Sequence, residues 1–110
     1  MTATKQVSTI DQQLRFAIAN TRLIEFSYHG IRRVAEPHDY GIQNGTIKLL
    51  VYQRTRAGGS DPRDDSVQGW RLLEVDKMTE CSVVEATFSG SRGAAHHRHH
   101  AWDVVYARVR

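Results

Sequence analysis

Two arginines placed within apolar runs have the chemistry that is easiest to define in this chain. Arg33 lies in the run of residues 31–37, and Arg71 begins the run of residues 71–78. A guanidinium group is a planar fork of donors that pairs bidentately with phosphate or carboxylate oxygens. We therefore expect Arg33 and Arg71 to converge on one anionic ligand. The alternative is an ordinary ion pair of each arginine with a nearby acidic residue: Glu36, Glu74 or Asp76.

Tyr28, Lys48 and Arg32 are candidates for supporting this ligand site, and two further aromatic residues are considered beside them. Tyr28 precedes a turn, so we expect its ring to be reachable for base stacking, which contributes about 1 to 3 kcal/mol per base. Lys48 and Arg32 would extend a basic track along a nucleic-acid backbone, but solubilising strand residues have the same pattern. Tyr52 and Trp70 also offer stacking surfaces, and strand alternation favours core packing for Tyr52.

A histidine cluster near the end of the chain has two interpretations, a metal site and a solvated loop. His96, His97, His99 and His100 surround Arg98, and neutral imidazoles bind zinc, nickel or copper. Their spacing defines no ligand set, and no cysteine joins them. We therefore expect a solvated loop with neither a metal nor another cofactor.

No arrangement of side chains in the sequence predicts catalysis. Ser89-Gly90-Ser91 lacks the strand-to-helix context of a nucleophile elbow, and Gly58-Gly59-Ser60 lacks the lysine of a phosphate-binding loop. The pair Asp64-Asp65 has no fixed partner. We expect a binding protein rather than an enzyme.

Length and composition indicate one globular domain. The chain has 110 residues, and 15 Lys and Arg against 12 Asp and Glu give a formal charge of +3, which mildly attracts anions. The one cysteine, Cys81, forms no internal disulfide and is typical of a reducing cytoplasm. No apolar run reaches the roughly 20 residues of a membrane span, and no secretion signal opens the chain. We expect a cytoplasmic protein with no membrane partner.

The start of the chain predicts a single helix. Ser8 with Asp11, or Thr9 with Gln12, offers an N-cap followed by an acidic or amide residue. The apolar residues that follow recur on one stripe: Ile10, Leu14, Ala17 and Ile18. We expect this helix to lie on a sheet and to end near residues 20–21.

Alternation with a period of two begins at residue 23, and His29-Gly30 predicts a tight turn before the next strand. A two-residue turn places Phe26 opposite Arg33. A three-residue turn places Phe26 opposite Val34 and exposes Arg33 on the other face. The apolar pattern favours the three-residue turn.

The following residues predict further short strands. Pro37 ends a strand or makes it an edge, and residues 40–42 begin another. Asn44-Gly45 is the strongest hairpin signal, and residues 47–53 are apolar on both faces, which indicates a central strand. Four later segments complete the pattern: a long loop over 54–68, a strand over 70–75 with a turn or single helical turn over 76–78, a strand over 79–88, and a strand over 102–109.

These elements predict a mainly β fold: a short N-terminal helix, a small five-stranded and partly open β-barrel, and an extra C-terminal strand. The expected organisation is a disordered N-terminus over 1–7, the helix and barrel over 8–88, and a linker, the histidine cluster and the last strand over 89–110.

Four segments within residues 12–84 form one pattern: Phe26 to Tyr28, Arg33 to Pro37, Ile47-Lys48-Leu49, and Arg71 to Met78. In this pattern the chain resembles the WYL domain family of bacterial regulators, with Ile47-Lys48-Leu49 in place of Trp-Tyr-Leu and Lys77-Met78 in place of Arg-Ile. The resemblance implies an Sm-like barrel behind a helix, acting in transcription regulation as a ligand sensor. Some members bind nucleotides or single-stranded nucleic acid, and Arg33 and Arg71 match the family's basic groove. We expect no winged helix within these residues, so a separate DNA-binding regulator would be the partner.

The C-terminal strand offers a different function, that of a self-assembling or partner-binding module. An edge strand can pair with a neighbouring copy and form a homo-oligomer. The interface would then contain Trp102, Val104 or Val105, and Tyr106.

Overall fold

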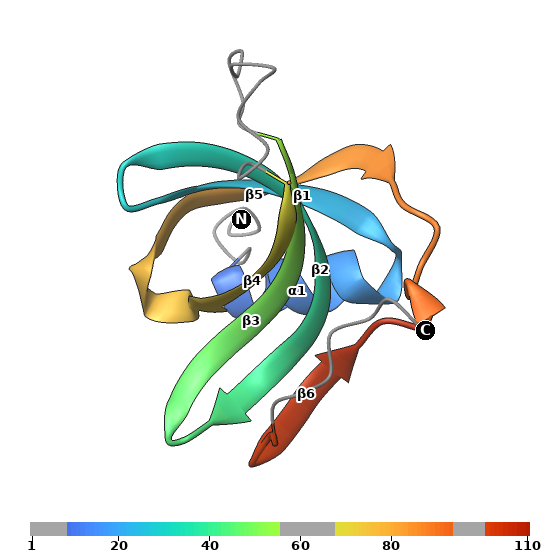
Figure 1. The fold of residues 1–110 in the computed structure, drawn as a ribbon. Helices are drawn as coiled ribbons and strands as arrows, with labels where there is room; N and C mark the ends of the chain where they lie inside the picture. Colours follow the sequence, from blue (N-terminus) through green and yellow to red (C-terminus); the bar gives the residue numbers. More distant parts are fainter. Residues whose placement is uncertain (1–8, 56–67, 94–100) are drawn as a thin grey trace, which may run out of the picture.

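The structure is a computed structural model that describes residues 9–55, 68–93 and 101–110. It is mainly β, with an N-terminal helix followed by antiparallel strands in one sheet, as predicted (Figure 1). The elements are α1 (Ile10–Ala19), β1 (Arg22–Tyr28), β2 (Ile31–Gln43), β3 (Thr46–Thr55), β4 (Gly69–Glu74), the 3₁₀-helix η3 (Val75–Lys77), β5 (Met78–Thr87) and β6 (Val104–Arg108).

The helix α1 begins with a capping box at Thr9 and Gln12. The Gln12 backbone N–H donates to the Thr9 hydroxyl at 3.2 Å, and the Thr9 backbone N–H donates to Gln12 Oε1 at 3.0 Å. Of the two start signals in the sequence, the structure therefore uses the one at Thr9. The apolar stripe of α1, with Leu14, Ala17 and Ile18 buried, packs against β1, β2, β5 and β6.

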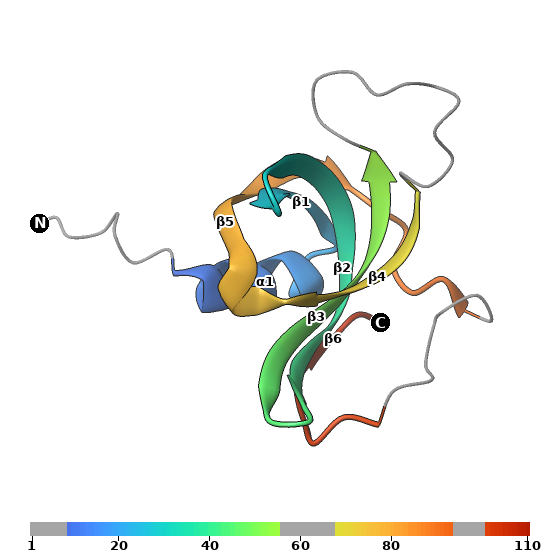
Figure 2. The ribbon, with the colours of Figure 1, turned by 60° about the vertical axis from the view of Figure 1, so that its left-hand side comes forward.

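The sheet has the strand order β4-β3-β2-β1-β5, and β6 pairs with β2. Because β3 follows one edge of β2, the other edge is shared: β1 pairs with residues 31–35 of β2, and β6 pairs with residues 39–42. In the described part of the chain β4 and β5 do not pair, so the strongly curved sheet is not closed into a barrel (Figures 1 and 2).

Pro37 lies inside β2, so of the two predicted alternatives the end of a strand was wrong; the proline lies where one edge of β2 has no ladder partner. β2 is one continuous strand of 13 residues that includes the predicted strand over 40–42. The proline is tolerated because the edge of β2 opposite β3 has no ladder partner at this point. Pairing with β1 ends at Ala35 and pairing with β6 begins at Asp39, so no backbone N–H is needed at Pro37. A register shift between Pro37 and Asp39 marks a β-bulge at this point.

The β1–β2 hairpin has the two-residue turn, so the favoured three-residue turn was wrong. Tyr28 lies opposite Ile31, and Phe26 lies opposite Arg33. His29 and Gly30 have φ angles of 52° and 76°, and positive φ at both central positions is typical of the type I′ turn that matches the twist of hairpin strands. This register turns Arg33 toward the core.

The core lies between α1 and the inner face of the sheet, which we define as the face that carries Ile24, Phe26, Ala35, Val51 and Leu73. The opposite face is the outer face. Figure 2 shows α1 against the inner side of the curved strands. The resulting burial of aliphatic and aromatic side chains stabilises the fold.

Three predictions fall outside the described residues: the disordered N-terminus over 1–7, the cluster His96 to His100, and most of the loop over 54–68. β3 extends to Thr55, two residues into that predicted loop. Among the described residues, no helix combines the length and the apolar character that crossing a membrane requires.

Candidate functional site

Arg33 and Arg71 lie on the same face of the sheet, on the two strands that flank β3. Arg33 is opposite Phe26 in the β1–β2 ladder, and Arg71 is opposite Val51 in the β3–β4 ladder. Directly opposed residues share a face, and both partners are buried on the inner face. The predicted site residues with the clearest chemistry are therefore on one surface.

Gln53 lies between the two arginines. Arg33 Nη1 donates to Gln53 Oε1 at 3.0 Å. Gln53 is opposite Gly69, and a Cβ built on Gly69 would lie 3.2 Å from Nη1 of Arg71. The Arg71 guanidinium thus extends over the glycine that faces Gln53. The two guanidinium groups flank this one buried amide.

Arg33 is held in place by neutral groups as well as by packing. Its Nη2 donates to the Tyr28 carbonyl oxygen at 3.2 Å, and its Cζ lies 5.4 Å from the centre of the Tyr28 ring. A cation over an aromatic face is attracted to the ring, by about 0.5 to 2 kcal/mol. These contacts explain how an arginine is accommodated beside Phe26.

Arg71 is oriented by its own strand, and its Nη1 donates to the Trp70 carbonyl oxygen at 2.9 Å. Two of the acidic residues considered as ion-pair partners have other partners in the structure. Glu36 pairs with Arg92 and Arg54, and Glu74 pairs with Lys77 at 3.5 Å.

The Tyr28 ring packs against the Arg33 guanidinium and offers no exposed face for stacking on a ligand. Tyr28 is 8% exposed, so the expectation that it is reachable for stacking was wrong. Its hydroxyl accepts a hydrogen bond from the Glu74 backbone N–H at 3.0 Å. This contact joins β1 to the end of β4, so Tyr28 draws distant parts of the curved sheet together. Burial follows from strand alternation, because Tyr28 lies two residues after buried Phe26 and therefore on the same inner face.

Lys48 and Arg32 are not gathered with Arg33 and Arg71. Lys48 alternates with buried Leu49 and therefore lies on the outer face, where its Nζ donates to Gln43 Oε1 at 2.8 Å. Arg32 also lies on the outer face, next in sequence to Arg33. Its contacts are with β1 and β5: Ser27 Oγ at 3.2 Å, the Glu80 carbonyl at 2.8 Å, and the Glu25 carboxylate at 3.5 Å.

Tyr52 and Trp70 form an aromatic pair on the outer face. Their ring centres are 5.3 Å apart at an angle of 85°, an edge-to-face arrangement. Tyr52 is half-buried, with the Arg92 Cζ 3.6 Å from its ring centre. The two aromatic residues therefore face away from Arg33.

A buried carboxylate on the outer face was missed by sequence reasoning. Glu36, 3% exposed, accepts from Arg92 Nε at 3.0 Å and Nη2 at 2.8 Å, and from Arg54 Nη1 at 3.1 Å. His38 Nε2 lies 3.0 Å from Glu36 Oε1. Burial raises the pKa of Glu36, but the hydrogen bonds from Arg92 and His38 outweigh it and hold the pKa below its ordinary value. This cluster fastens the segment after β5 to the sheet.

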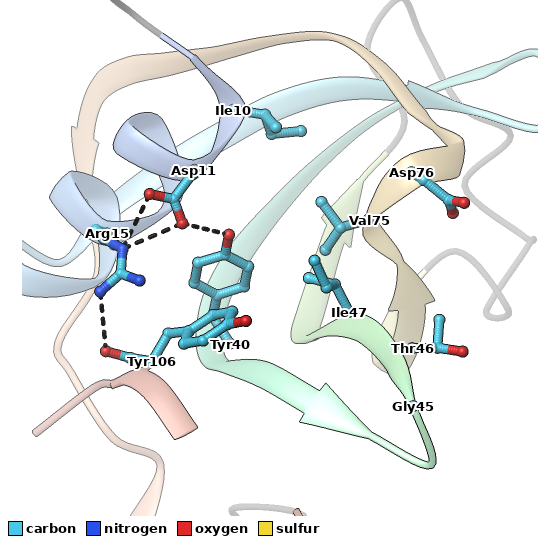
Figure 3. Close-up of a pocket in the computed structure, with 10 residues that line it drawn as sticks. All are labelled: Ile10, Asp11, Arg15, Tyr40, Gly45, Thr46, Ile47, Val75, Asp76 and Tyr106. Atoms are coloured by element: carbon cyan, nitrogen blue, oxygen red, sulfur yellow. Dashed lines mark hydrogen bonds and ion pairs between the residues drawn. The ribbon is translucent and has the colours of Figure 1, made fainter. Parts of the chain in front are cut away.

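The second feature missed from the sequence is a pocket of about 660 Å³ between α1, the β2–β3 hairpin and η3, which we call the hairpin pocket (Figure 3). Its lining combines aliphatic, aromatic and charged residues: Ile10, Asp11, Arg15, Tyr40, Gly45, Thr46, Ile47, Val75, Asp76 and Tyr106. These residues come from distant segments, and the only local signal was the i, i+4 pair of Asp11 and Arg15.

A hydrogen-bonded network forms one wall of the hairpin pocket. The Tyr40 hydroxyl donates to Asp11 Oδ1 at 2.6 Å, and Arg15 Nε donates to the same carboxylate at 3.1 Å. Burial and the Asp11 carboxylate raise the pKa of Tyr40, so this hydroxyl stays protonated and donating at neutral pH. The bond from Tyr40 and the charge of Arg15 together lower the pKa of Asp11.

The described residues contain no group of three or more His, Cys, Asp or Glu side chains that could hold a metal ion. The candidate histidines His96, His97, His99 and His100 are outside those residues. Compared with family models, with curated proteins and with solved structures, the chain gives no match.

Proposed function

We propose that this chain is a ligand-binding regulatory module that binds an anionic ligand, a nucleotide or short single-stranded nucleic acid, between Arg33 and Arg71. One observation carries the proposal: two arginines on separate strands share the inner face and flank Gln53. Because guanidinium groups pair with phosphate oxygens in a fixed geometry, two of them on one surface suit a phosphate group.

Preorganisation favours binding at this place. Arg33 is oriented by Gln53 and by the Tyr28 carbonyl before any ligand arrives. Less side-chain entropy is then lost on binding than for a freely moving arginine. The formal charge of +3 adds a weak attraction for anions over longer distances.

We propose further that the module is of WYL type, with an Sm-like arrangement of β1 to β5. The helix before the strands, the order β4-β3-β2-β1-β5 and the short η3 between β4 and β5 support this arrangement. The contact between Tyr28 and Glu74 supports partial closure by side chains where strand pairing stops. In such a module a separate DNA-binding regulator would receive the signal.

Binding measurements on charge-neutral variants test this proposal. Titration with nucleotides and short single-stranded oligonucleotides should give saturable binding that weakens with salt, because phosphate contacts release counterions. Arg33→Gln and Arg71→Gln should each weaken it by about tenfold, the equivalent of 1.4 kcal/mol. The control Arg22→Gln removes an arginine that donates to the Val84 carbonyl instead. Equal affinity in wild type and the Arg33/Arg71 double variant would contradict the site.

A second candidate function is partner binding or self-assembly through β6. This strand pairs with β2 of its own chain, and Val104 and Val105 are 45% and 43% exposed. Two exposed valines on an edge strand favour pairing with another strand. Light scattering over a range of concentrations tests this, since Val105→Lys should convert an oligomer to a monomer. A wild type that is monomeric at every concentration would contradict it.

A further inference from the structure

We propose that the hairpin pocket binds a small organic cation, a protonated amine carried on a compact apolar body such as an aromatic ring. This site is separate from the arginine site and has the opposite charge preference. It rests on the shape, lining and charge of the pocket.

The size and walls of the hairpin pocket suit the apolar body of such a ligand. Its volume of about 660 Å³ lies within the range of about 300 to 1,000 Å³ that is typical of small-molecule sites. Figure 3 shows Ile47 and Val75 facing the rings of Tyr40 and Tyr106 across the opening. A flat or compact apolar group would contact aliphatic carbons on one side and tyrosine rings on the other.

The walls are fixed before a ligand binds. Tyr40 is 3% exposed, and its hydroxyl is held by Asp11 at 2.6 Å. Tyr106 packs edge to face against Tyr40, with ring centres 5.1 Å apart at 67°. Rigid walls reduce the entropy that binding loses.

The charges around the hairpin pocket favour a cation. Asp11 is compensated by Arg15, with 3.1 Å between the Arg15 Nε and the carboxylate. Asp76 on the rim is exposed, and the described residues offer its carboxylate no ion-pair partner. The lining therefore has two carboxylates and one guanidinium, which leaves one negative charge in excess.

The tyrosine rings add to this preference. Arg15 already lies 5.0 Å from the centre of the Tyr106 ring and 5.9 Å from that of Tyr40. Figure 3 shows Arg15 on one side of the two rings and Ile47 and Val75 on the other. Because Tyr40 is buried and Tyr106 is half-buried, the Tyr106 ring is the one that a second cation in the pocket would contact. The electron-rich face of a tyrosine attracts a desolvated ammonium group.

Three probes of the same shape test the proposal by NMR titration of the full chain. They are 2-phenylethylamine, which is cationic at pH 7, the neutral 2-phenylethanol and the anionic 3-phenylpropionate. The amine should give saturable shifts at the amides of Gly45, Thr46 and Asp76. It should bind about tenfold more tightly than the alcohol, the equivalent of 1.4 kcal/mol, and the anion should bind most weakly.

Variants of residues that line the hairpin pocket test whether the preference for the amine arises there. Asp76→Asn should abolish the preference for the amine over the alcohol, whereas the control Glu85→Gln, an exposed carboxylate on β5, should retain it. Ile47→Arg places a cation in the opening and should block the amine; Ile47 is 42% exposed, so the fold tolerates the change. Failure of the amine to saturate, equal binding of the three probes, or an unchanged preference in Asp76→Asn overturns the proposal. Nucleotide binding at Arg33 and Arg71 does not enter this test, so the two sites can fail independently.

Discussion

The Arg33 guanidinium donates through Nη1 to Oε1 of buried Gln53, at 3.0 Å, from the neighbouring strand. Gln53 is neutral, so this contact holds the arginine on the inner face without itself cancelling the charge of the guanidinium. An acidic partner would fix the side chain equally well but would neutralise the field that an anion needs. Gln53 is therefore a positioning residue for the proposed anion site.

Gln53→Leu should weaken anion binding without removing a positive charge. We expect a loss of about 1 to 3 kcal/mol in the free energy of unfolding, because a buried donor of Arg33 loses its acceptor. The affinity for a nucleotide should fall as well as the free energy of unfolding. Urea unfolding and nucleotide titration measure the two effects.

The matched control for Gln53 is Gln43→Leu. Gln43 is also buried and also accepts from a cation, Lys48 Nζ at 2.8 Å. It lies at the last residue of β2, whereas Arg33 lies near the start of that strand. This variant should lower stability and leave the nucleotide affinity unchanged. Unchanged nucleotide affinity in Gln53→Leu would mean that Arg33 needs no support from the amide.

Gly41→Ala should displace β6 from the sheet. A Cβ built on Gly41 lies 2.0 Å from the Val104 carbonyl oxygen, so the backbone of β6 cannot stay where it is. We expect faster hydrogen exchange at the amides of β6, while α1 and β1 to β5 keep their protection. The control Gly30→Ala strains a turn with φ of 76° but has open space around the Cβ, so β6 exchange should not change. Normal protection of the β6 amides in Gly41→Ala would contradict the close contact between Gly41 and the β6 backbone.

Local patterns in the sequence were sufficient to predict most elements of the fold. The capping residues of α1 and the Asn44-Gly45 turn act within a few residues, and both are present. The register at His29-Gly30 was wrong because the apolar pattern treats arginine as a surface residue. Its true position depends on Gln53, which approaches only once β2 and β3 have paired.

The bulge after Pro37 also limited what the sequence could predict. Strict alternation from Arg33 along β2 would place Tyr40 on the outer face. The register shift between Pro37 and Asp39 turns Tyr40 inward instead, opposite Leu49, where it reaches Asp11. The hairpin pocket therefore depends on one inserted residue. The contact of Glu36 with Arg92 similarly joins residues with no shared local pattern.

Stability should fall in acid because of Glu36. The pKa of this carboxyl is lowered from its ordinary value of 4.5 in the folded state. A group with a lowered folded pKa stabilises the protein above the unfolded pKa, and that contribution disappears as the pH falls through the folded pKa. At pH 7, Glu36→Gln should lower the free energy of unfolding by about 1 to 3 kcal/mol.

Urea unfolding between pH 7 and pH 3 measures this dependence. The difference between wild type and Glu36→Gln should begin to shrink below pH 4.5, where Glu36 of the unfolded chain takes up a proton, and should vanish once the pH falls below the lowered pKa of folded Glu36. The exposed Glu80→Gln is the control and should run parallel to wild type. A difference that persists at low pH would show that packing, rather than charge, makes Glu36 important.

Two substitutions at Tyr28 separate its hydroxyl from its ring. Tyr28→Phe removes the acceptor for the Glu74 backbone N–H and should lower the free energy of unfolding by about 1 kcal/mol. The ring beneath Arg33 remains, so the nucleotide affinity should be preserved. Tyr28→Ala removes both, and should lower stability by about 3 to 5 kcal/mol and weaken the nucleotide as well. If Tyr28→Phe loses as much nucleotide affinity as Tyr28→Ala, then joining β1 to β4, and not supporting the Arg33 guanidinium, is what Tyr28 contributes to the site.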